Sequence, residues 1–151
     1  MIELKPLQKI PEGDDIKIFL AGSIEMGTAE NWQDKVTRLF EGQSVTILNP
    51  RRDSWDSSWK QTKDSLDFKQ QVDWELNALD KSDYIIMYFD PSTKSPISLL
   101  EMGLYAKSGK LLVVCPEGFW RKGNVDIVCE TYGAKQFETL DELIKYLIVL
   151  I

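Results

Sequence analysis

Glu101 is the first residue whose type and position in the sequence indicate chemistry. It lies four residues after Ile97 and four before Tyr105, so it shares the apolar stripe of a helix expected over residues 97–108. A buried carboxylate is costly unless it has partners, and the positive end of this helix is expected to help keep Glu101 ionised. An ionised carboxylate near the carboxyl end of a strand suits a nucleophile.

Glu75 interrupts the apolar stripe of a second helix in the same way. It lies three residues after Val72 and four before Leu79, in a helix expected over residues 66–79. Because Glu75 sits deeper in its helix, desolvation should raise its pKa. Two carboxylates whose pKa values are pushed apart can act as acid and nucleophile in retaining glycosyl transfer. The alternative for each glutamate is an ion pair with a nearby Lys or Arg, or exposure at the edge of the stripe.

The composition of the 151-residue chain narrows the chemistry further. The absence of histidine excludes imidazole acid–base catalysis and any Ser-His-Asp or Cys-His nucleophile within the chain. The net charge of −6, from 18 basic and 24 acidic residues, disfavours nucleic acid polymers and anionic membranes as partners. Cys115 and Cys129 lack metal-ligand spacing, and no signal core is present. We therefore expect a cytoplasmic protein that uses no metal or cofactor and binds small molecules.

The elements that must position the two glutamates follow an alternating pattern of strands and helices. This alternation predicts an α/β fold with a flavodoxin-like, doubly wound parallel sheet of five strands in the order 2-1-3-4-5, forming a single domain over residues 1–151. Ligands in such folds bind at the carboxyl ends of the strands. The strands are expected at 16–21, 44–48, 84–89, 111–115 and 133–137, and the helices at 29–41, 66–79, 97–108, 125–131 and 139–147.

Three further residues stand at the expected carboxyl edge of the sheet. Arg51 follows the second strand and can contact a carboxylate, a base carbonyl or a phosphate, or form a surface salt bridge instead. Trp55 lies in the long polar loop 51–65, where it can stack on a nucleobase or pin the loop to the core. Asp90 ends the third strand beside the expected pocket and is a candidate polar contact.

Three segments, taken in order, resemble the nucleoside 2-deoxyribosyltransferase family. They are Phe-Leu-Ala-Gly-Ser at 19–23, the stretch from Glu75 to Asp83, and residues 95–103, which end in Glu-Met-Gly. The specific features are the acidic residue eight positions before Asp83 and the Glu-x-Gly helix eighteen positions after it. The resemblance spans roughly residues 16–124. It implies a compact doubly wound α/β domain that cleaves the N-glycosidic bond of 2′-deoxynucleosides and moves the sugar to another purine or pyrimidine base.

The resemblance also implies roles for individual residues. Glu101 matches the nucleophile that attacks C1′ and forms a glycosyl ester, and Glu75 matches an acidic residue that helps to protonate or orient the base. Gly22 and Ser23 lie in the first loop of the pocket. Asn124 matches an asparagine that reaches the 5′-hydroxyl from a neighbouring subunit. The chain is therefore expected to form a homo-oligomer, a dimer, tetramer or hexamer, in which a neighbour completes each active site.

Ser95 departs from the transferase pattern, which often has an Asp six residues before the nucleophile. Serine at this place resembles the related 2′-deoxynucleoside 5′-monophosphate N-hydrolases, where it helps to hold the phosphate. Those hydrolases usually have an arginine soon after Gly-Ser, but here Ser23 is followed by Ile24 and Glu25. A carboxylate near a phosphate site would repel the ligand, so nucleosides are the favoured substrates. The N-hydrolase and a non-catalytic nucleotide-binding module remain the alternatives.

Overall fold

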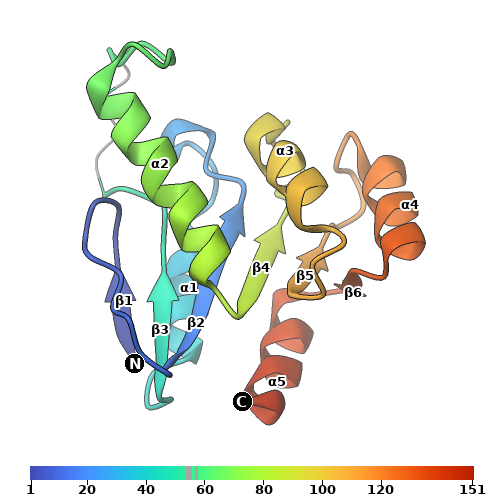
Figure 1. Cartoon of the computed structure of the whole chain (residues 1–151). Coiled ribbons are helices and arrows are strands. Elements are labelled where there is room, and N and C mark those ends of the chain that lie inside the picture. The colour runs from blue at the N-terminus through green and yellow to red at the C-terminus, as the bar shows by residue number, and fades with distance from the viewer. Residues whose placement is uncertain (54–55, 57) are drawn as a thin grey trace.

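A computed structural model describes residues 1–53, 56 and 58–151 of the chain (Figure 1). These described residues form one six-stranded parallel sheet in the order β1-β3-β2-β4-β5-β6. The carboxyl ends of the strands therefore all lie at the same edge of the sheet. The strands are β1 (Ile2–Leu4), β2 (Ile16–Gly22), β3 (Val45–Leu48), β4 (Tyr84–Tyr88), β5 (Leu111–Val114) and β6 (Lys135–Phe137).

The flavodoxin-like fold class is confirmed, but the prediction of five strands is wrong by one. The five expected strands pair in the predicted order, and β1 adds a sixth at the edge, in parallel register with β3. The extra strand has only three residues, Ile2-Glu3-Leu4. So short a segment shows no periodicity that would distinguish a strand from a loop.

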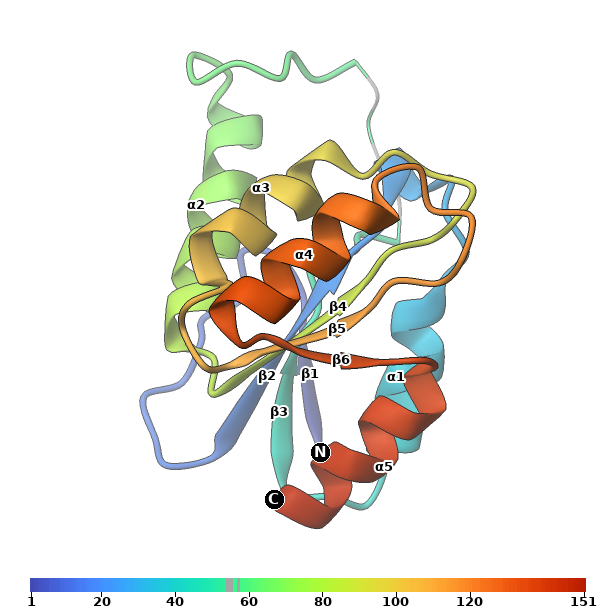
Figure 2. The ribbon, with the colours of Figure 1, turned by 90° about the vertical axis from the view of Figure 1, so that its right-hand side faces the viewer.

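Helices cover both faces of the sheet, with α2, α3 and α4 on one side and α1 and α5 on the other (Figure 2). In the described part of the chain, none of them is long and apolar enough to cross a membrane. The helices are α1 (Trp32–Leu39), α2 (Leu66–Lys81), α3 (Pro96–Tyr105), α4 (Lys122–Tyr132) and α5 (Leu140–Leu150), and a short 3₁₀ turn, η1, spans Glu25–Gly27.

Each predicted helix is present, and capping side chains explain where α1 and α5 begin. The helix expected from residue 29 begins at Trp32 because the side chain of Asn31 accepts a hydrogen bond from the backbone N–H of Asp34. Thr139 caps α5 as expected, since its hydroxyl accepts the N–H of Glu142 at 3.2 Å. The helix expected from residue 125 begins three residues earlier, at Lys122.

The core lies in two layers, one on each face of the sheet. Along β2, Phe19 and Ala21 point into the layer under α2, α3 and α4, whereas Ile18 and Leu20 point into the layer under α1 and α5. This alternation follows from the two-residue repeat of a strand, and burial on both faces explains why β2 is almost wholly apolar. The central strands are thus a rigid base for the loops at their carboxyl ends.

Gly22 ends β2 at a point where the backbone leaves no room for a side chain. Its φ of 128° lies in a region that favours glycine, and a Cβ atom would stand 2.2 Å from the carbonyl oxygen of Tyr88 in the neighbouring strand β4. That same carbonyl accepts the N–H of Ser23 at 2.9 Å. Gly22 therefore allows β2 and β4 to stay paired up to the edge where the first loop begins.

Gly22→Ala is expected to destabilise the protein by about 3 kcal/mol, because the added methyl group must push two central strands apart in a strained backbone conformation. Urea unfolding followed by circular dichroism measures this change. The control is Gly123→Ala, because Gly123 lies in α4 and no atom lies within 4 Å of its added Cβ. A Gly22→Ala protein as stable as the Gly123→Ala control would contradict the prediction.

Candidate active site

Glu101 of α3 and Glu75 of α2 lie in one site between the two helices. Glu101 is only 9% exposed, and Glu75 is also largely covered. Burial raises the pKa of Glu101 to about 8, and the negative charge of Glu75 adds to the increase. Burial likewise raises the pKa of Glu75, to about 7. The sequence placed both carboxylates on buried faces, and the structure brings them close enough for their charges to repel.

The expectation that the start of α3 keeps Glu101 ionised is wrong. Helix α3 begins at Pro96, so Glu101 lies beyond the first turn, where the backbone N–H groups are already used within the helix. None of the described residues donates a hydrogen bond to its carboxylate. Desolvation and repulsion therefore dominate, and they raise the pKa of Glu101 instead of lowering it.

Glu75, by contrast, has a hydrogen-bonded partner on its own helix. The side-chain N–H of Gln71 donates to Glu75 Oε1 at 2.5 Å, and the Gln71 carbonyl accepts from Nε of Arg52 at 2.6 Å. The guanidinium of Arg52 also lies over the ring of Trp59, 4.7 Å from its centre. Both the Gln71 hydrogen bond and the Arg52 charge oppose the increase in the pKa of Glu75. Sequence reasoning missed Gln71, although a glutamine four residues before an acidic residue can bond to it on a helix.

Ser23 and Ser95 belong to a buried cluster of three hydroxyl groups that joins two loops. The hydroxyl of Ser23 lies 2.5 Å from that of Ser95 and 3.0 Å from that of Thr93, which in turn lies 2.7 Å from Ser95. Ser23 also accepts the backbone N–H of Asp90 at 2.8 Å. These bonds fix the loop after β2 to the loop after β4. Substrate binding by Ser23 or Ser95 stays a prediction, and fixing the two loops is the role that their contacts support.

Asp90 lies at the end of β4, as predicted, and is held as an anion. Burial alone would raise its pKa, but hydrogen bonds from the hydroxyl and backbone N–H of Ser92, and from the backbone N–H of Glu30, outweigh it. The net effect is a lowered pKa. Asp90 therefore presents a fixed negative charge at the carboxyl edge of the sheet.

Glu25 reaches the amino-terminal end of α3, the helix that holds Glu101. Its Oε1 accepts the backbone N–H of Ser95 at 2.7 Å. The contact depends on unusual backbone conformations, since Glu25, Met26 and Ser95 have φ values of 47°, 53° and 46°. A carboxylate of the protein thus occupies the place where the N–H of Ser95, just before α3, would otherwise meet solvent or a ligand.

Arg51 is buried, and its guanidinium already binds the protein. Its two terminal nitrogens donate to the carbonyl oxygens of Gly27, Ala29 and Glu30 at 2.7–3.0 Å, and to the side chain of Gln33 at 3.3 Å. Arg51 therefore holds the segment after β2 in place. Its contact with substrate stays a prediction. The alternative was a surface salt bridge, and Arg51 forms none with the described residues.

Arg52 lines a polar hollow beside that segment. The hollow is bordered by Lys5, Arg51, Arg52 and Asp53. Nη2 of Arg52 is buried and has no hydrogen-bond partner among the described residues, so it is an unsatisfied donor. Through Gln71, Arg52 connects this hollow to the carboxylate of Glu75. Trp55, the predicted stacking residue, lies outside the described residues.

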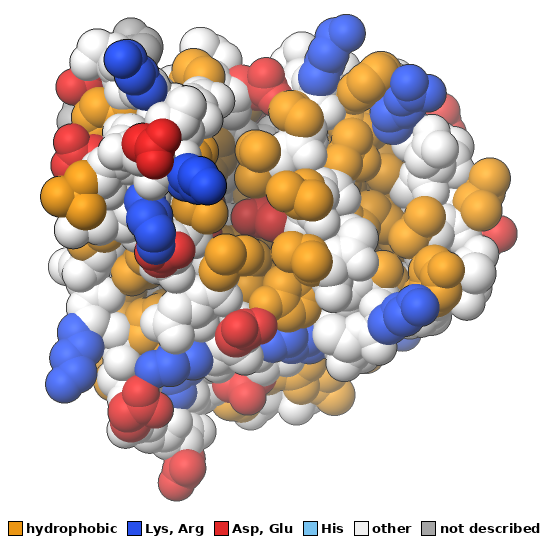
Figure 3. All heavy atoms as spheres, turned by 45° about the horizontal axis from the view of Figure 1, so that its top comes forward, with side chains coloured by type: hydrophobic (Ala, Val, Ile, Leu, Met, Phe, Trp, Pro, Cys, Tyr) orange, Lys and Arg blue, Asp and Glu red, His pale blue; other side chains and the backbone are white. Residues whose placement is uncertain are grey.

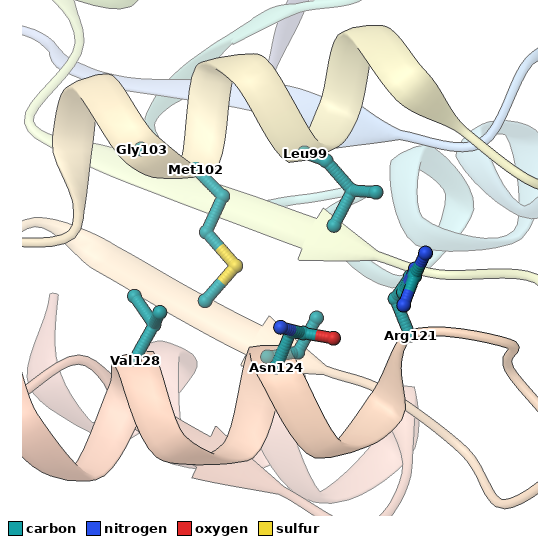
Figure 4. Close-up of a pocket in the computed structure, with 7 residues that line it drawn as sticks. Leu99, Met102, Gly103, Arg121, Asn124 and Val128 are labelled. Carbon is teal, nitrogen blue, oxygen red and sulfur yellow. The ribbon is translucent and has the colours of Figure 1, made fainter.

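Asn124 lies on α4 and points into a groove between α3 and α4 (Figure 4). Leu99 and Met102 line the opposite side, and Arg121 stands at one end. Glu101 is not among the residues that line this groove. In its own chain, Asn124 therefore lies in a groove that Glu101 does not line.

The outer surface of α3 is unusually apolar. Ile97, Leu100 and Leu104 are 59%, 62% and 58% exposed, and Ile127 of α4 is 64% exposed. Figure 3 turns the carboxyl edge of the sheet toward the viewer. Hydrophobic side chains gather across the middle of this face, and an acidic side chain lies recessed among them. Exposed apolar patches of this kind mark interaction surfaces.

A comparison with protein families gives a match over residues 15–119, to the model described as nucleoside 2-deoxyribosyltransferase like. The match covers more than half of the chain. The chain belongs to this nucleoside 2-deoxyribosyltransferase-like family. A comparison with curated proteins gave no match. The matched range runs from β2 beyond β5 and contains both Glu75 and Glu101, whereas Asn124 lies outside it.

The carboxylate pair of this nucleoside 2-deoxyribosyltransferase-like protein should make its stability depend on pH. The pKa values of Glu75 and Glu101 are raised from about 4.5 to about 7 and 8, so the folded chain binds more protons than the unfolded chain between these values. The free energy of unfolding is therefore expected to fall by about 6 kcal/mol as the pH rises from 5 to 9. Urea unfolding across this range measures the fall.

The control is the double variant Glu75→Gln, Glu101→Gln, which keeps the shape of both side chains but removes their titration. Its free energy of unfolding should change much less between pH 5 and 9 than that of the wild type. A pH dependence that is the same in both proteins would show that the pair is not the cause.

Proposed function

We propose that this protein is a nucleoside 2-deoxyribosyltransferase that forms a covalent deoxyribosyl ester on Glu101. The observation that carries the proposal is the pair of buried carboxylates on α2 and α3, whose charges repel. With pKa values of about 7 and 8, the pair holds about one proton near neutral pH. One anion and one acid are what retaining glycosyl transfer requires.

The proposed reaction has two steps, and the bonds and protons are accounted for in each. In the first, Glu101 attacks C1′ of the deoxynucleoside, the C1′–N bond breaks, and its electron pair goes to the departing base. Glu75 donates the proton that the base nitrogen needs. In the second, a nitrogen of another base attacks C1′, Glu101 leaves as a carboxylate, and Glu75 takes the proton back. Each cycle thus returns the pair to the state in which it began.

Glu25 supports deoxynucleosides over deoxynucleoside 5′-monophosphates as substrates. Its carboxylate already accepts the Ser95 N–H at the start of α3, where an anionic phosphate would be repelled. A neutral 5′-hydroxyl carries no such penalty. The other residues that we propose at the substrate are Gly22, Ser23, Arg51, Trp55, Asp90, Ser95 and Asn124. Of these, Ser23, Arg51 and Ser95 act through the loops that they hold.

We further propose that residues 1–151 act as one domain within a homo-oligomer and take small molecules, deoxynucleosides and free bases, as their partners. The exposed apolar residues of α3 and α4 support an interface between copies. Asn124 would then enter the active site of a neighbouring subunit, in keeping with its place in a groove that Glu101 of its own chain does not line.

Incubation with thymidine, with and without adenine, tests the proposed activity. The expected result is deoxyadenosine and thymine when adenine is present. Deoxyribose without a new nucleoside would show that the protein is an N-hydrolase, and repeating the assay with deoxynucleoside monophosphates would show whether a phosphate is needed. Binding without any cleavage would leave only a nucleotide-binding module.

A further inference from the structure

Among the described residues, one carboxylate of the pair accepts a hydrogen bond from the protein and the other accepts none. Glu75 accepts from Gln71, and the positive charge of Arg52 lies nearby. Glu101 has no hydrogen-bond donor among the described residues. The two glutamates are chemically identical, so this difference in surroundings decides which of them holds the shared proton in the ligand-free protein.

The orientation of the Gln71 amide is fixed from both sides. Nε of Arg52 can only donate, so it must meet the amide oxygen, which it does at 2.6 Å. The amide nitrogen then faces Glu75 Oε1 at 2.5 Å and the carbonyl oxygen of Pro50 at 3.4 Å. Both of these are acceptors. Arg52 therefore forces Gln71 to present a donor to Glu75, and a donor stabilises the ionised form of a carboxylate.

The surroundings of Glu101 favour its neutral form. The charge that acts on its pKa is the negative one of Glu75. Tyr105, one turn further along α3, donates its hydroxyl hydrogen to Asp80 instead. Strand β2, against which α3 packs, contributes the apolar side chains of Phe19 and Ala21 to this layer of the core. A carboxyl group in such surroundings keeps its proton.

We propose that Arg52 and Gln71 are positioning residues that hold Glu75 as the anion of the ligand-free pair and leave the shared proton on Glu101. This inference rests on the proposed function and assigns a resting state to the same site. The order of the pKa values, about 7 for Glu75 and about 8 for Glu101, agrees with the hydrogen bonds. The nucleophile is thus kept inactive until a substrate binds.

Substrate binding then reverses the two protonation states. Hydrogen-bond donors of the sugar or base stabilise the anion of Glu101, and its proton passes to Glu75, so that the total number of protons is unchanged. Glu101 is now the nucleophile and Glu75 the acid, as glycosyl transfer requires.

The test is a carbon-13 NMR titration of the glutamate carboxyl groups in the ligand-free protein, assigned with the Glu75→Gln and Glu101→Gln variants. In the wild type, Glu75 should ionise at lower pH than Glu101. Gln71→Met should raise the pH at which Glu75 ionises by about one unit, because the donor is lost. Arg52→Met, a second and independent variant, should move it in the same direction. Asp73→Asn, an exposed change on the same helix, should leave it unmoved.

The proposal is overturned if Glu75 keeps its proton to higher pH than Glu101 in the wild type. It is equally overturned if Gln71→Met and Arg52→Met, both folded by circular dichroism, titrate like Asp73→Asn. Because the titration needs no turnover, it separates this inference from the proposed function. In an active protein, kcat/KM declines on the acid side of its pH profile, and Gln71→Met should raise the pH of this decline by about one unit. A merely structural role would lower the rate without moving that pH.

Discussion

Glu101→Gln is expected to lower kcat/KM for deoxyribosyl transfer by about ten-thousandfold or more, as removal of a nucleophile does in enzymes with a covalent intermediate. The amide has nearly the shape of the carboxylate but cannot form a glycosyl ester. Synthesis of deoxyadenosine from thymidine and adenine, followed by chromatography, measures the loss. The residual rate would come from the groups that bind the base and the sugar.

A covalent adduct distinguishes loss of the nucleophile from loss of binding. Wild-type protein mixed with a 2-fluoro deoxynucleoside should gain the mass of the fluorinated sugar on Glu101, and Glu101→Gln should not. The variant should also fold, because it removes the repulsion between two buried carboxylates, and above pH 8 it should be more stable than the wild type. If the variant retains more than about one hundredth of the wild-type activity, another group is the nucleophile.

The carboxylate pair was predictable because its signal is local. Glu75 and Glu101 each interrupt an apolar repeat within a single helix, and three-to-four-residue spacing places a side chain on a helix face without knowledge of the rest of the fold. Alternation of strands and helices then placed both helices over the same sheet. The protonation of Glu101 was mispredicted, because that depends on how far into α3 the residue lies and on which side chains approach it.

The residues that surround the pair were harder to predict because their contacts join distant segments. Arg52 meets Gln71 across 19 positions, and Ser23 meets Ser95 across 72. Arg51 binds backbone carbonyl oxygens more than twenty positions away, and its place in the sequence did not indicate these contacts. No periodicity records such contacts, since they follow from the packing of loops at the edge of the sheet.

These long-range contacts divide the site into two parts, a frame of loops and two carboxylates that come from helices. The loops after β2, β3 and β4 are fixed to one another by Arg51 and by the hydroxyl groups of Ser23, Thr93 and Ser95. The carboxylates instead come from α2 and α3, which pack on β2. A rigid frame of loops beside two helix-borne reactive groups is the arrangement that preorganised catalysis needs.

Glu75→Gln is the second change with a large expected effect, a fall of about a hundredfold to ten-thousandfold in kcat for natural deoxynucleosides. A departing base needs a proton on its nitrogen, and glutamine cannot provide one. The hydrogen bond from Gln71 would also be lost or reversed, because an amide at this position offers a donor as well as an acceptor. Steady-state assays at pH 7 with thymidine and adenine measure the change.

The choice of leaving group separates proton donation from structural damage by Glu75→Gln. A 2-deoxyriboside of an acidic phenol leaves as an anion and needs no proton, so the variant should cleave it with a loss much smaller than for thymidine. Glu101 should still form its ester, because the nucleophile is intact and the repulsion from Glu75 that raises its pKa is gone. Equal losses on both substrates would mean that Glu75 orients the site but does not supply the proton.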